Sequence, residues 1–261
     1  MKKTLSLLNL LSVILVIAIN YASQAIRINE TTIGEISNKY YNLFTPAGYA
    51  FAIWGLIFLA LLAYGIFQVR RAYFTTEKSE FIEQTSYWFI SANVLNCTWV
   101  FAFTFDYTGL SVLIMLGILF SLIKVILNTN MERWHAPKAI IAFVWWPICI
   151  YSGWIAVATI ANISAYLSKL GWEGGFLSEI SWTIIMILIA AALNVFMIFN
   201  RNMREFAAVG IWALFAIFIR HKDSIESIAY TALRASIVIF LIAAWYGFKN
   251  RKSNPFFPFS N

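Results

Sequence analysis

Residues 108–128 read TGLSVLIMLGILFSLIKVILN, a run in which Lys124 is the one charged residue. A helix needs about 20 mostly apolar residues to cross the hydrocarbon core of a bilayer, which is roughly 30 Å thick. This stretch therefore predicts a membrane-spanning α-helix rather than a helix of a soluble domain.

Comparable apolar runs recur along the whole chain. They cover approximately residues 4–22, 48–69, 86–105, 108–128, 139–162, 180–199, 206–220 and 227–248. The composition agrees, since 61% of the 261 residues are hydrophobic and 12% are charged, whereas soluble domains carry about 25% charged residues. The predicted fold is all-α, a polytopic membrane helix bundle of about eight transmembrane helices.

The distribution of lysine and arginine predicts the orientation of these helices. With the amino terminus in the cytoplasm, twelve of the basic residues in connections or at helix ends fall on the cytoplasmic side and five on the other. Short loops rich in Lys and Arg stay in the cytoplasm. We therefore expect both termini inside, in a bacterial inner (cell) membrane. The net charge of +7 then needs no nucleic-acid partner.

Three segments depart from a simple bundle. Lys2 and Lys3 precede the first apolar run, which could be a cleaved signal peptide, although its length favours a retained helix. The polar stretch of residues 23–47 is long for a bundle connection, so it is either a lid or slack. A glycine-containing break at residues 168–179 separates a five-helix part from a three-helix part.

Metal and acid–base chemistry find little support in the sequence. Cys97 and Cys149 lie in apolar runs and are interpreted as small core residues, while His135 and His221 stand alone in polar connections. The acidic residues fall in connections or at helix ends, so neither catalytic residues nor a metal site is predicted. Whether the chain is an enzyme stays open.

Cations and aromatic side chains inside the runs are the remaining signals. Lys124 is placed to reach the interface, whereas Arg234 lies deeper, where it could contact an anion or pair with helix carbonyls. Trp54, Trp99 and Trp154 lie well inside their helices, where a flat indole suits either an aromatic pocket or ordinary core packing. Polar residues within runs are Asn93, Asn96, Thr98, Ser152, Thr159, Asn162 and Asn194, and these serve interhelical hydrogen bonds or ligand contact.

Three segments resemble the tryptophan-rich sensory protein family, also called TspO/MBR or translocator protein. Residues 44–54, FTPAGYAFAIW, are similar to the entry to the family's second helix, with Thr45 in place of the first of two prolines. Residues 95–99, LNCTW, match the third-helix pattern L-N-x-x-W. Trp154, Ala158 and Asn162 keep the spacing W-x-x-x-A-x-x-x-N, although the family's proline before this tryptophan is displaced here to Pro147.

The resemblance implies a five-helix bundle over residues 1–167 whose pocket, closed by the first loop, binds a flat hydrophobic ligand. Residues 168–252 would be a three-helix extension beyond the usual family length, followed by a cytoplasmic tail at 253–261. The ligand implied is a porphyrin, a haem-like tetrapyrrole or a sterol, with no cofactor certain. The ligand-binding residues implied are Trp54, Asn96, Trp99, Tyr151, Trp154, Ala158 and Asn162.

Several functions remain compatible with these patterns. The first is a receptor or carrier that binds a tetrapyrrole-like ligand for sensing or transport, with the lipid bilayer and the hydrophobic small molecule as its partners, as a monomer or a homodimer. The alternative is a small-molecule permease or the membrane subunit of a transporter. An intramembrane enzyme would need convergent acid, base or metal groups, except for porphyrin photochemistry, which needs only aromatic side chains.

Overall fold

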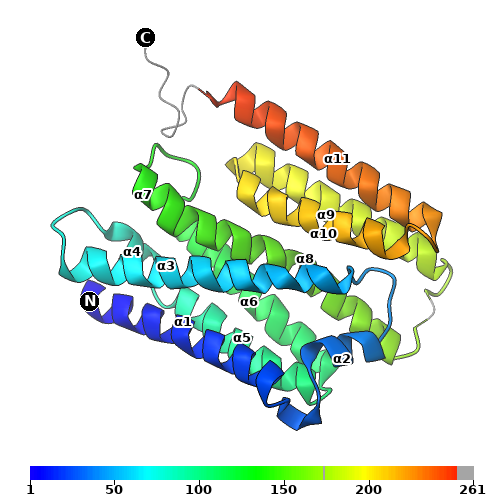
Figure 1. Cartoon of the computed structure of the whole chain (residues 1–261). Coiled ribbons are helices and arrows are strands. Elements are labelled where there is room, and N and C mark those ends of the chain that lie inside the picture. Colours follow the sequence, from blue (N-terminus) through cyan, green and yellow to red (C-terminus); the bar gives the residue numbers. More distant parts are fainter. Residues whose placement is uncertain (173, 252–261) are drawn as a thin grey trace. The chain divides into compact units, whose positions relative to one another are not determined.

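The described chain is built from helices. A computed structural model describes residues 1–172 and 174–251, and within these ranges it contains helices and turns but no strand (Figure 1). Each of the eight predicted apolar runs forms a helix. The long helices are α1 (Lys2–Ala25), α3 (Ile53–Tyr73), α5 (Trp88–Thr104), α6 (Thr108–Asn128), α8 (Trp146–Lys169), α9 (Glu179–Arg201), α10 (Arg204–His221) and α11 (Glu226–Lys249).

Short helices join or extend these long ones. They are η1 (Ile28–Glu30), α2 (Ile33–Lys39), η2 (Gly48–Ala52), α4 (Glu80–Thr85), α7 (Lys138–Ile140) and η3 (Ile141–Trp145). The start of α2 follows from its sequence, because Thr32 accepts a hydrogen bond from the Glu35 backbone N–H while the Glu35 carboxylate accepts one from the Thr32 backbone. This capping box orders part of the long first loop.

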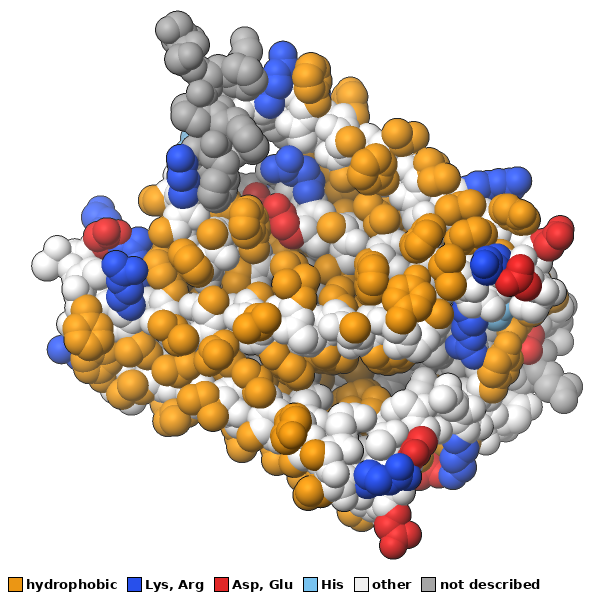
Figure 2. Space-filling view, in the orientation of Figure 1, with side chains coloured by type: hydrophobic (Ala, Val, Ile, Leu, Met, Phe, Trp, Pro, Cys, Tyr) orange, Lys and Arg blue, Asp and Glu red, His pale blue; other side chains and the backbone are white. Residues whose placement is uncertain are grey.

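The membrane character of the chain is confirmed. Among the described residues, six helical segments are long and apolar enough to cross a bilayer, namely Lys2–Ala25, Gly48–Tyr73, Thr108–Asn128, Lys138–Lys169, Glu179–Arg201 and Glu226–Lys249. On the face in Figure 2, hydrophobic side chains cover the helices and charged side chains gather toward helix ends. Of the other two long helices, α5 has 17 residues, and α10 carries charged residues in both terminal turns.

Contacts between residues divide the chain into two compact units. Unit 1 comprises residues 1–42, 53–130 and 158–172, and unit 2 comprises residues 43–52, 131–157 and 173–261. The unit boundaries describe contacts and not family membership, so the division at residue 167 stays a prediction. The predicted tail at 253–261 lies outside the described residues.

In unit 1, α1 packs beside α3 and α5, and α5 packs beside α6 (Figure 1). Close approach between α1 and α3 depends on Gly65, because a Cβ atom there would lie 3.2 Å from the Cα atom of Leu10. Small residues of this kind allow the backbones of membrane helices to pack closely.

In unit 2, α9, α10 and α11 lie side by side (Figure 1), and α10 also holds residues 43–52. The Trp212 indole donates to the Ala50 carbonyl at 3.1 Å, and the Arg220 guanidinium donates to the Thr45 carbonyl. The Ala47 N–H donates to the Ala216 carbonyl at 3.2 Å. The entry to the second apolar run is therefore anchored by a helix from the part of the chain after residue 168.

A π-helical segment marks the displaced proline of the fifth run. The segment η3 ends at Trp145, immediately before Trp146 and Pro147. Proline has no N–H to donate, and its ring crowds the carbonyl four residues earlier, so a wider helical turn before it relieves the clash. The irregularity of this run therefore has a local cause in the sequence.

Single residues noted in the sequence have the following environments. Cys97 and Cys149 are buried and free, as interpreted. His221 ends α10 and is 1% exposed, with Nε2 2.9 Å from the Leu43 carbonyl, so it is part of the packed structure rather than a plain loop histidine. Lys124 lies over the ring of Trp88 at 5.6 Å from its centroid. Arg234 is exposed on α11.

Candidate ligand-binding site

Two residues from separate sequence motifs meet in unit 1. The indole N–H of Trp99 on α5 donates to Oδ1 of Asn162 on α8, at 2.7 Å, across 63 positions of sequence. Both side chains are buried, with 7% and 4% of their surface exposed. A buried indole needs a partner for its N–H, and Asn162 supplies it.

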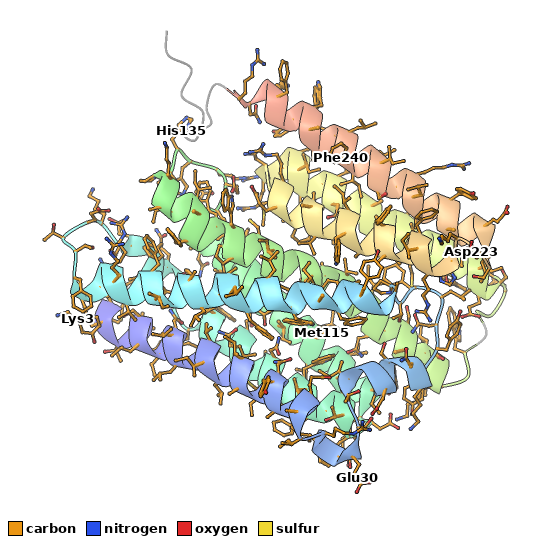
Figure 3. All side chains as sticks on the ribbon, in the orientation of Figure 1. Lys3, Glu30, Met115, His135, Asp223 and Phe240 are labelled. Carbon is orange, nitrogen blue, oxygen red and sulfur yellow. The ribbon has the colours of Figure 1, made fainter. Side chains whose placement is uncertain are left out.

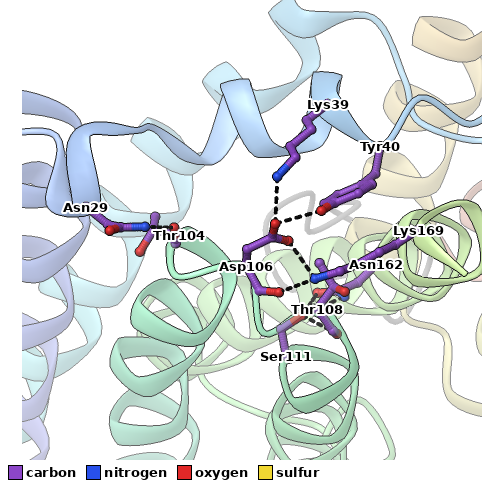
Figure 4. Close-up of polar contacts among 9 residues, drawn as sticks. All are labelled: Asn29, Lys39, Tyr40, Thr104, Asp106, Thr108, Ser111, Asn162 and Lys169. Carbon is purple, nitrogen blue, oxygen red and sulfur yellow. Dashed lines mark hydrogen bonds and ion pairs between the residues drawn. The ribbon is translucent and has the colours of Figure 1, made fainter.

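A polar network then fixes the Asn162 amide. Its Nδ2 donates to the Ser111 hydroxyl at 2.8 Å, and that hydroxyl in turn donates to the Thr108 carbonyl at 2.7 Å (Figure 4). The ring of Trp99 stacks on Phe103, with centroids 5.0 Å apart and planes 18° apart. The indole is therefore fixed at its polar edge by Asn162 and on one face by Phe103.

The other predicted site residues of unit 1 lie in different surroundings. Asn96 is 1% exposed, and its Oδ1 accepts a hydrogen bond from Asn20 of α1 at 3.1 Å. Trp54 is half-buried on α3 and stacks on Phe58, with centroids 5.2 Å apart. Ala158 is half-buried on α8, one helical turn before Asn162. Direct contact thus joins Trp99 to Asn162, while Asn96 engages α1.

Tyr151 and Trp154 belong to unit 2 and are almost fully buried, at 0% and 2% exposure. The ring of Phe51 meets Trp154 edge to face, with centroids 5.7 Å apart. This contact joins the second-run motif to the fifth-run motif within unit 2. The predicted anion contact Arg234 is exposed on α11 and has not been brought into this group.

The first loop is fastened to unit 1 through Asp106, which lies between α5 and α6. The Asp106 carboxylate accepts hydrogen bonds from Lys39 Nζ at 2.7 Å, Tyr40 Oη at 2.6 Å and Lys169 Nζ at 2.9 Å (Figure 4). Burial opposes ionisation of Asp106, but these three donors outweigh it and lower the pKa of the carboxyl to about 2. Asp106 is therefore ionised at neutral pH and holds the loop to α8.

Comparison with known families agrees with the motifs. A family model described as TSPO-like protein matches residues 6–245. The chain belongs to the TSPO-like family. The match includes α9 and α10 and most of α11, which the sequence motifs alone left outside the family. No curated protein and no solved structure shows significant similarity to the chain.

Sequence reasoning missed part of the polar interior of this TSPO-like membrane protein. Asn9 and Asn20 of α1 and Gln68 of α3 are buried, at 0%, 8% and 0% exposure, and all three bond to side chains of other helices. Their spacing was the available signal, because Asn9, Ser12 and Asn20 share one face of the first run.

Unit 2 of this TSPO-like chain also holds a carboxylate–thiol group that the sequence did not predict. Ligand atoms of Glu132, Cys149 and Glu205 lie within 4.8 Å of one another. Burial and the nearby Glu205 carboxylate raise the pKa of Glu132 to about 8. Two carboxyl groups this close retain a proton near neutral pH, because a second buried negative charge is costly.

Proposed function

We propose that this TSPO-like membrane protein binds a flat, hydrophobic small molecule of the porphyrin, tetrapyrrole or sterol type, in sensing or transport. The observation that carries the proposal is the hydrogen bond between Trp99 and Asn162. Two residues that the family resemblance assigns to the ligand are thereby in direct contact, although they come from distant segments.

The chemistry of this pair suits such a ligand. Inside a bilayer an unpaired N–H is costly, so the bond to Asn162 holds the indole ring in one orientation. A ring fixed in this way offers apolar surface without a large loss of side-chain entropy on binding. Trp54, Asn96 and Ala158 of unit 1 are further candidates, and Tyr151 and Trp154 of unit 2 are candidates on the resemblance alone.

The hydrogen bonds that hold the first loop support a role as a cover over the ligand site rather than as an unattached connection. Besides the Asp106 contacts, Ser168 donates to the Tyr41 carbonyl at 2.8 Å, and Asn29 donates to the Thr104 carbonyl at 3.0 Å. These bonds attach the loop at Asn29 and again at residues 39–41, all within unit 1. A cover of this kind excludes water from an apolar ligand.

We further propose that both termini face the cytoplasm of a bacterial inner membrane. Lys2 and Lys3 at the start of α1, and Arg70 and Arg71 at the end of α3, then lie on the same side. The positive-inside rule favours this orientation. The homodimer stays a prediction.

A porphyrin titration of the detergent-purified protein tests the function. Because the chain has eleven tryptophans, binding is followed by the absorbance of the porphyrin rather than by indole fluorescence. We expect a saturable change that Trp99→Phe weakens, since phenylalanine keeps the ring character but cannot bond Asn162. The matched control is Trp245→Phe, at an exposed position of α11.

Each outcome of this titration is informative. Saturable binding that falls in Trp99→Phe and persists in Trp245→Phe supports a specific site at Trp99. Non-saturable uptake, equal in all three proteins, means partitioning into detergent and overturns the proposal. In that case solute flux in vesicles would test the permease alternative.

A further inference from the structure

The buried face of α1 carries five polar residues beside Leu5, Val13 and Val16, although α1 is one of the segments able to cross a membrane. We call the buried polar residues Ser6, Asn9, Ser12, Asn20 and Ser23 the α1 seam. The exposed face carries large apolar side chains instead, including Leu11 and Ile14 at 59% and 49% exposure. Lys3 and Glu30, labelled in Figure 3, mark the two ends of the region that the seam follows.

In the part of α1 nearer Lys3, the seam bonds to two neighbouring helices. Asn9 Nδ2 donates to Gln68 Oε1 of α3 at 2.7 Å. Asn93 Nδ2 of α5 donates to the Ser12 hydroxyl at 2.9 Å, and that hydroxyl donates to the Asn9 carbonyl at 2.7 Å. These bonds gather the amides of Asn9, Gln68 and Asn93 around one turn of α1.

Three atoms of these amides have no hydrogen-bond partner within the described residues. They are Asn9 Oδ1, Gln68 Nε2 and Asn93 Oδ1. All three side chains have 0% exposure. A buried polar group left without a partner costs about 1–3 kcal/mol, and lipid cannot supply the missing bond. Three such atoms at one junction therefore point to a ligand.

The balance of donors and acceptors selects the class of ligand. Two of the atoms accept hydrogen bonds and one donates. A bare cation would be opposed by the Gln68 N–H, and an anion would be opposed by the two carbonyl oxygens. A water molecule donates twice and accepts once at such a site, and three bonds are typical of buried waters.

Either placement of the oxygen and nitrogen atoms in the side-chain amides leads to the same class of ligand. Exchanging oxygen and nitrogen in both Asn9 and Gln68 preserves their mutual bond and again leaves one donor and one acceptor. Asn93 keeps its nitrogen toward Ser12, because that hydroxyl already donates to Asn9. A ligand that both donates and accepts is required under either assignment.

We propose that the junction of α1, α3 and α5 binds a long-lived water molecule that bridges Asn9, Gln68 and Asn93. This hydration site is separate from the proposed ligand site and does not depend on it. It lies one turn of α5 away from Asn96, which bonds the next polar residue of the seam, Asn20. The water completes the hydrogen bonding of unit 1 where three helices meet.

The test is water–amide cross-relaxation in the full-length protein, deuterated and labelled with ¹⁵N at Asn and Gln side chains, in detergent micelles. Bound water with a lifetime beyond nanoseconds gives cross-peaks of opposite sign in the laboratory-frame and rotating-frame experiments, whereas direct exchange of amide protons with water gives peaks of equal sign in both. We expect such transfer from water to the Gln68 amide. The matched control is Asn162, whose oxygen and nitrogen both have protein partners.

The measurement on the wild-type protein alone tests the proposal. Transfer to Gln68 well above that to Asn162 supports a bound water, whereas equal or absent transfer overturns it. A shift of the Gln68 resonance when sodium replaces potassium would also overturn it, in favour of a cation. Asn93→Leu, which removes one acceptor, should reduce the transfer to Gln68, and the spectrum of that variant reports whether it has folded.

Discussion

The two units keep their helices together by different means. Unit 1 combines the close contact at Gly65 with amide and hydroxyl bonds between helices, as in the α1 seam and the Trp99–Asn162 pair. Unit 2 relies on small residues, with Gly153 of α8 against Phe206, Gly210 of α10 against Asn194, and buried alanines along α10 and α11. Lipid tails are as apolar as the helix surfaces, so the hydrophobic effect contributes little to helix association in a membrane. Close packing or hydrogen bonds between helices must stabilise the association instead.

This difference has a functional consequence. Side-chain amides fix orientation and offer polar edges to a ligand, whereas glycine and alanine contacts chiefly set the distance between helices. The candidate residues with a defined polar geometry lie in unit 1 for that reason. Unit 2 contributes a scaffold that anchors residues 43–52 through α10.

The largest expected effect comes from filling a close contact of unit 2. A Cβ atom at Gly153 would lie 2.9 Å from the Phe206 carbonyl oxygen and 3.2 Å from its Cα atom. Gly153→Ala should therefore lower the free energy of unfolding by about 2–3 kcal/mol, because backbone must move. Thermal unfolding followed by circular dichroism measures this loss.

The control for that change is Gly55→Ala on α3, where a Cβ atom would meet nothing within 4 Å. Alanine is favoured over glycine in a helix by about 0.5–1 kcal/mol, so Gly55→Ala should be neutral or stabilising. Equal Tm values for the two variants would show that close packing at Gly153 is unimportant.

A polar substitution in unit 1 should cost slightly less. Asn9→Leu removes the partner of the Gln68 amide, which is fully buried. We expect a loss of about 1–3 kcal/mol in unfolding free energy, the cost of an unsatisfied buried group. Thr98→Val is the control, since Thr98 is exposed and its hydroxyl donates to the Val94 carbonyl of its own helix. Similar unfolding curves for both variants would contradict a structural role for the seam.

The carboxyl pair of unit 2 predicts a dependence on pH. The pKa of Glu132 is raised from 4.5 to about 8, so between these values the folded state binds more protons than the unfolded state. The contribution of Glu132 to the free energy of unfolding is therefore fully present below about pH 4.5 and is lost as the pH rises toward 8. The decline should be roughly 1 kcal/mol from pH 6 to pH 7.

Glu132→Gln provides the comparison for this pH effect, because the amide does not titrate. The difference in Tm between the wild-type protein and the variant should grow from pH 5 to pH 8, to the disadvantage of the wild type. Two parallel profiles would mean that Glu132 ionises normally in the folded protein.

The smallest effect on stability is expected at the exposed loop contact. Lys39→Met removes one of three donors to Asp106, and the side chain of Lys39 is 55% exposed, so Tm should change little. The loop should nevertheless be cut faster by protease in Lys39→Met than in Lys222→Met, a similarly exposed lysine. Identical digestion rates would argue against Asp106 as the attachment point.

The sequence predicted the helices well because apolar run length is a strong signal in a bilayer. All eight runs became helices, and the motifs around Trp99 and Asn162 named two residues that are in contact. Asn9 and Asn20 were missed because isolated polar residues in an apolar run look minor until their shared face is considered.

Other features could be recognised only in the three-dimensional structure. The convergence of Glu132, Cys149 and Glu205 joins a connection, a helix interior and a helix start that are distant in sequence. His221 seemed to lie in a polar connection, yet it is buried against the Leu43 carbonyl. Contacts between residues that are distant in the chain produce no periodic pattern in a single sequence, so the sequence alone did not predict them.

We propose that the Trp99–Asn162 pair of unit 1 forms part of the ligand site. The most direct measurement compares porphyrin affinity in Asn162→Ala and Asn194→Ala, two buried asparagines of which one lies in each unit. We predict at least about a tenfold loss of affinity in Asn162→Ala, which frees the Trp99 N–H, and no change in Asn194→Ala. Equal affinities in the two variants would contradict the claim.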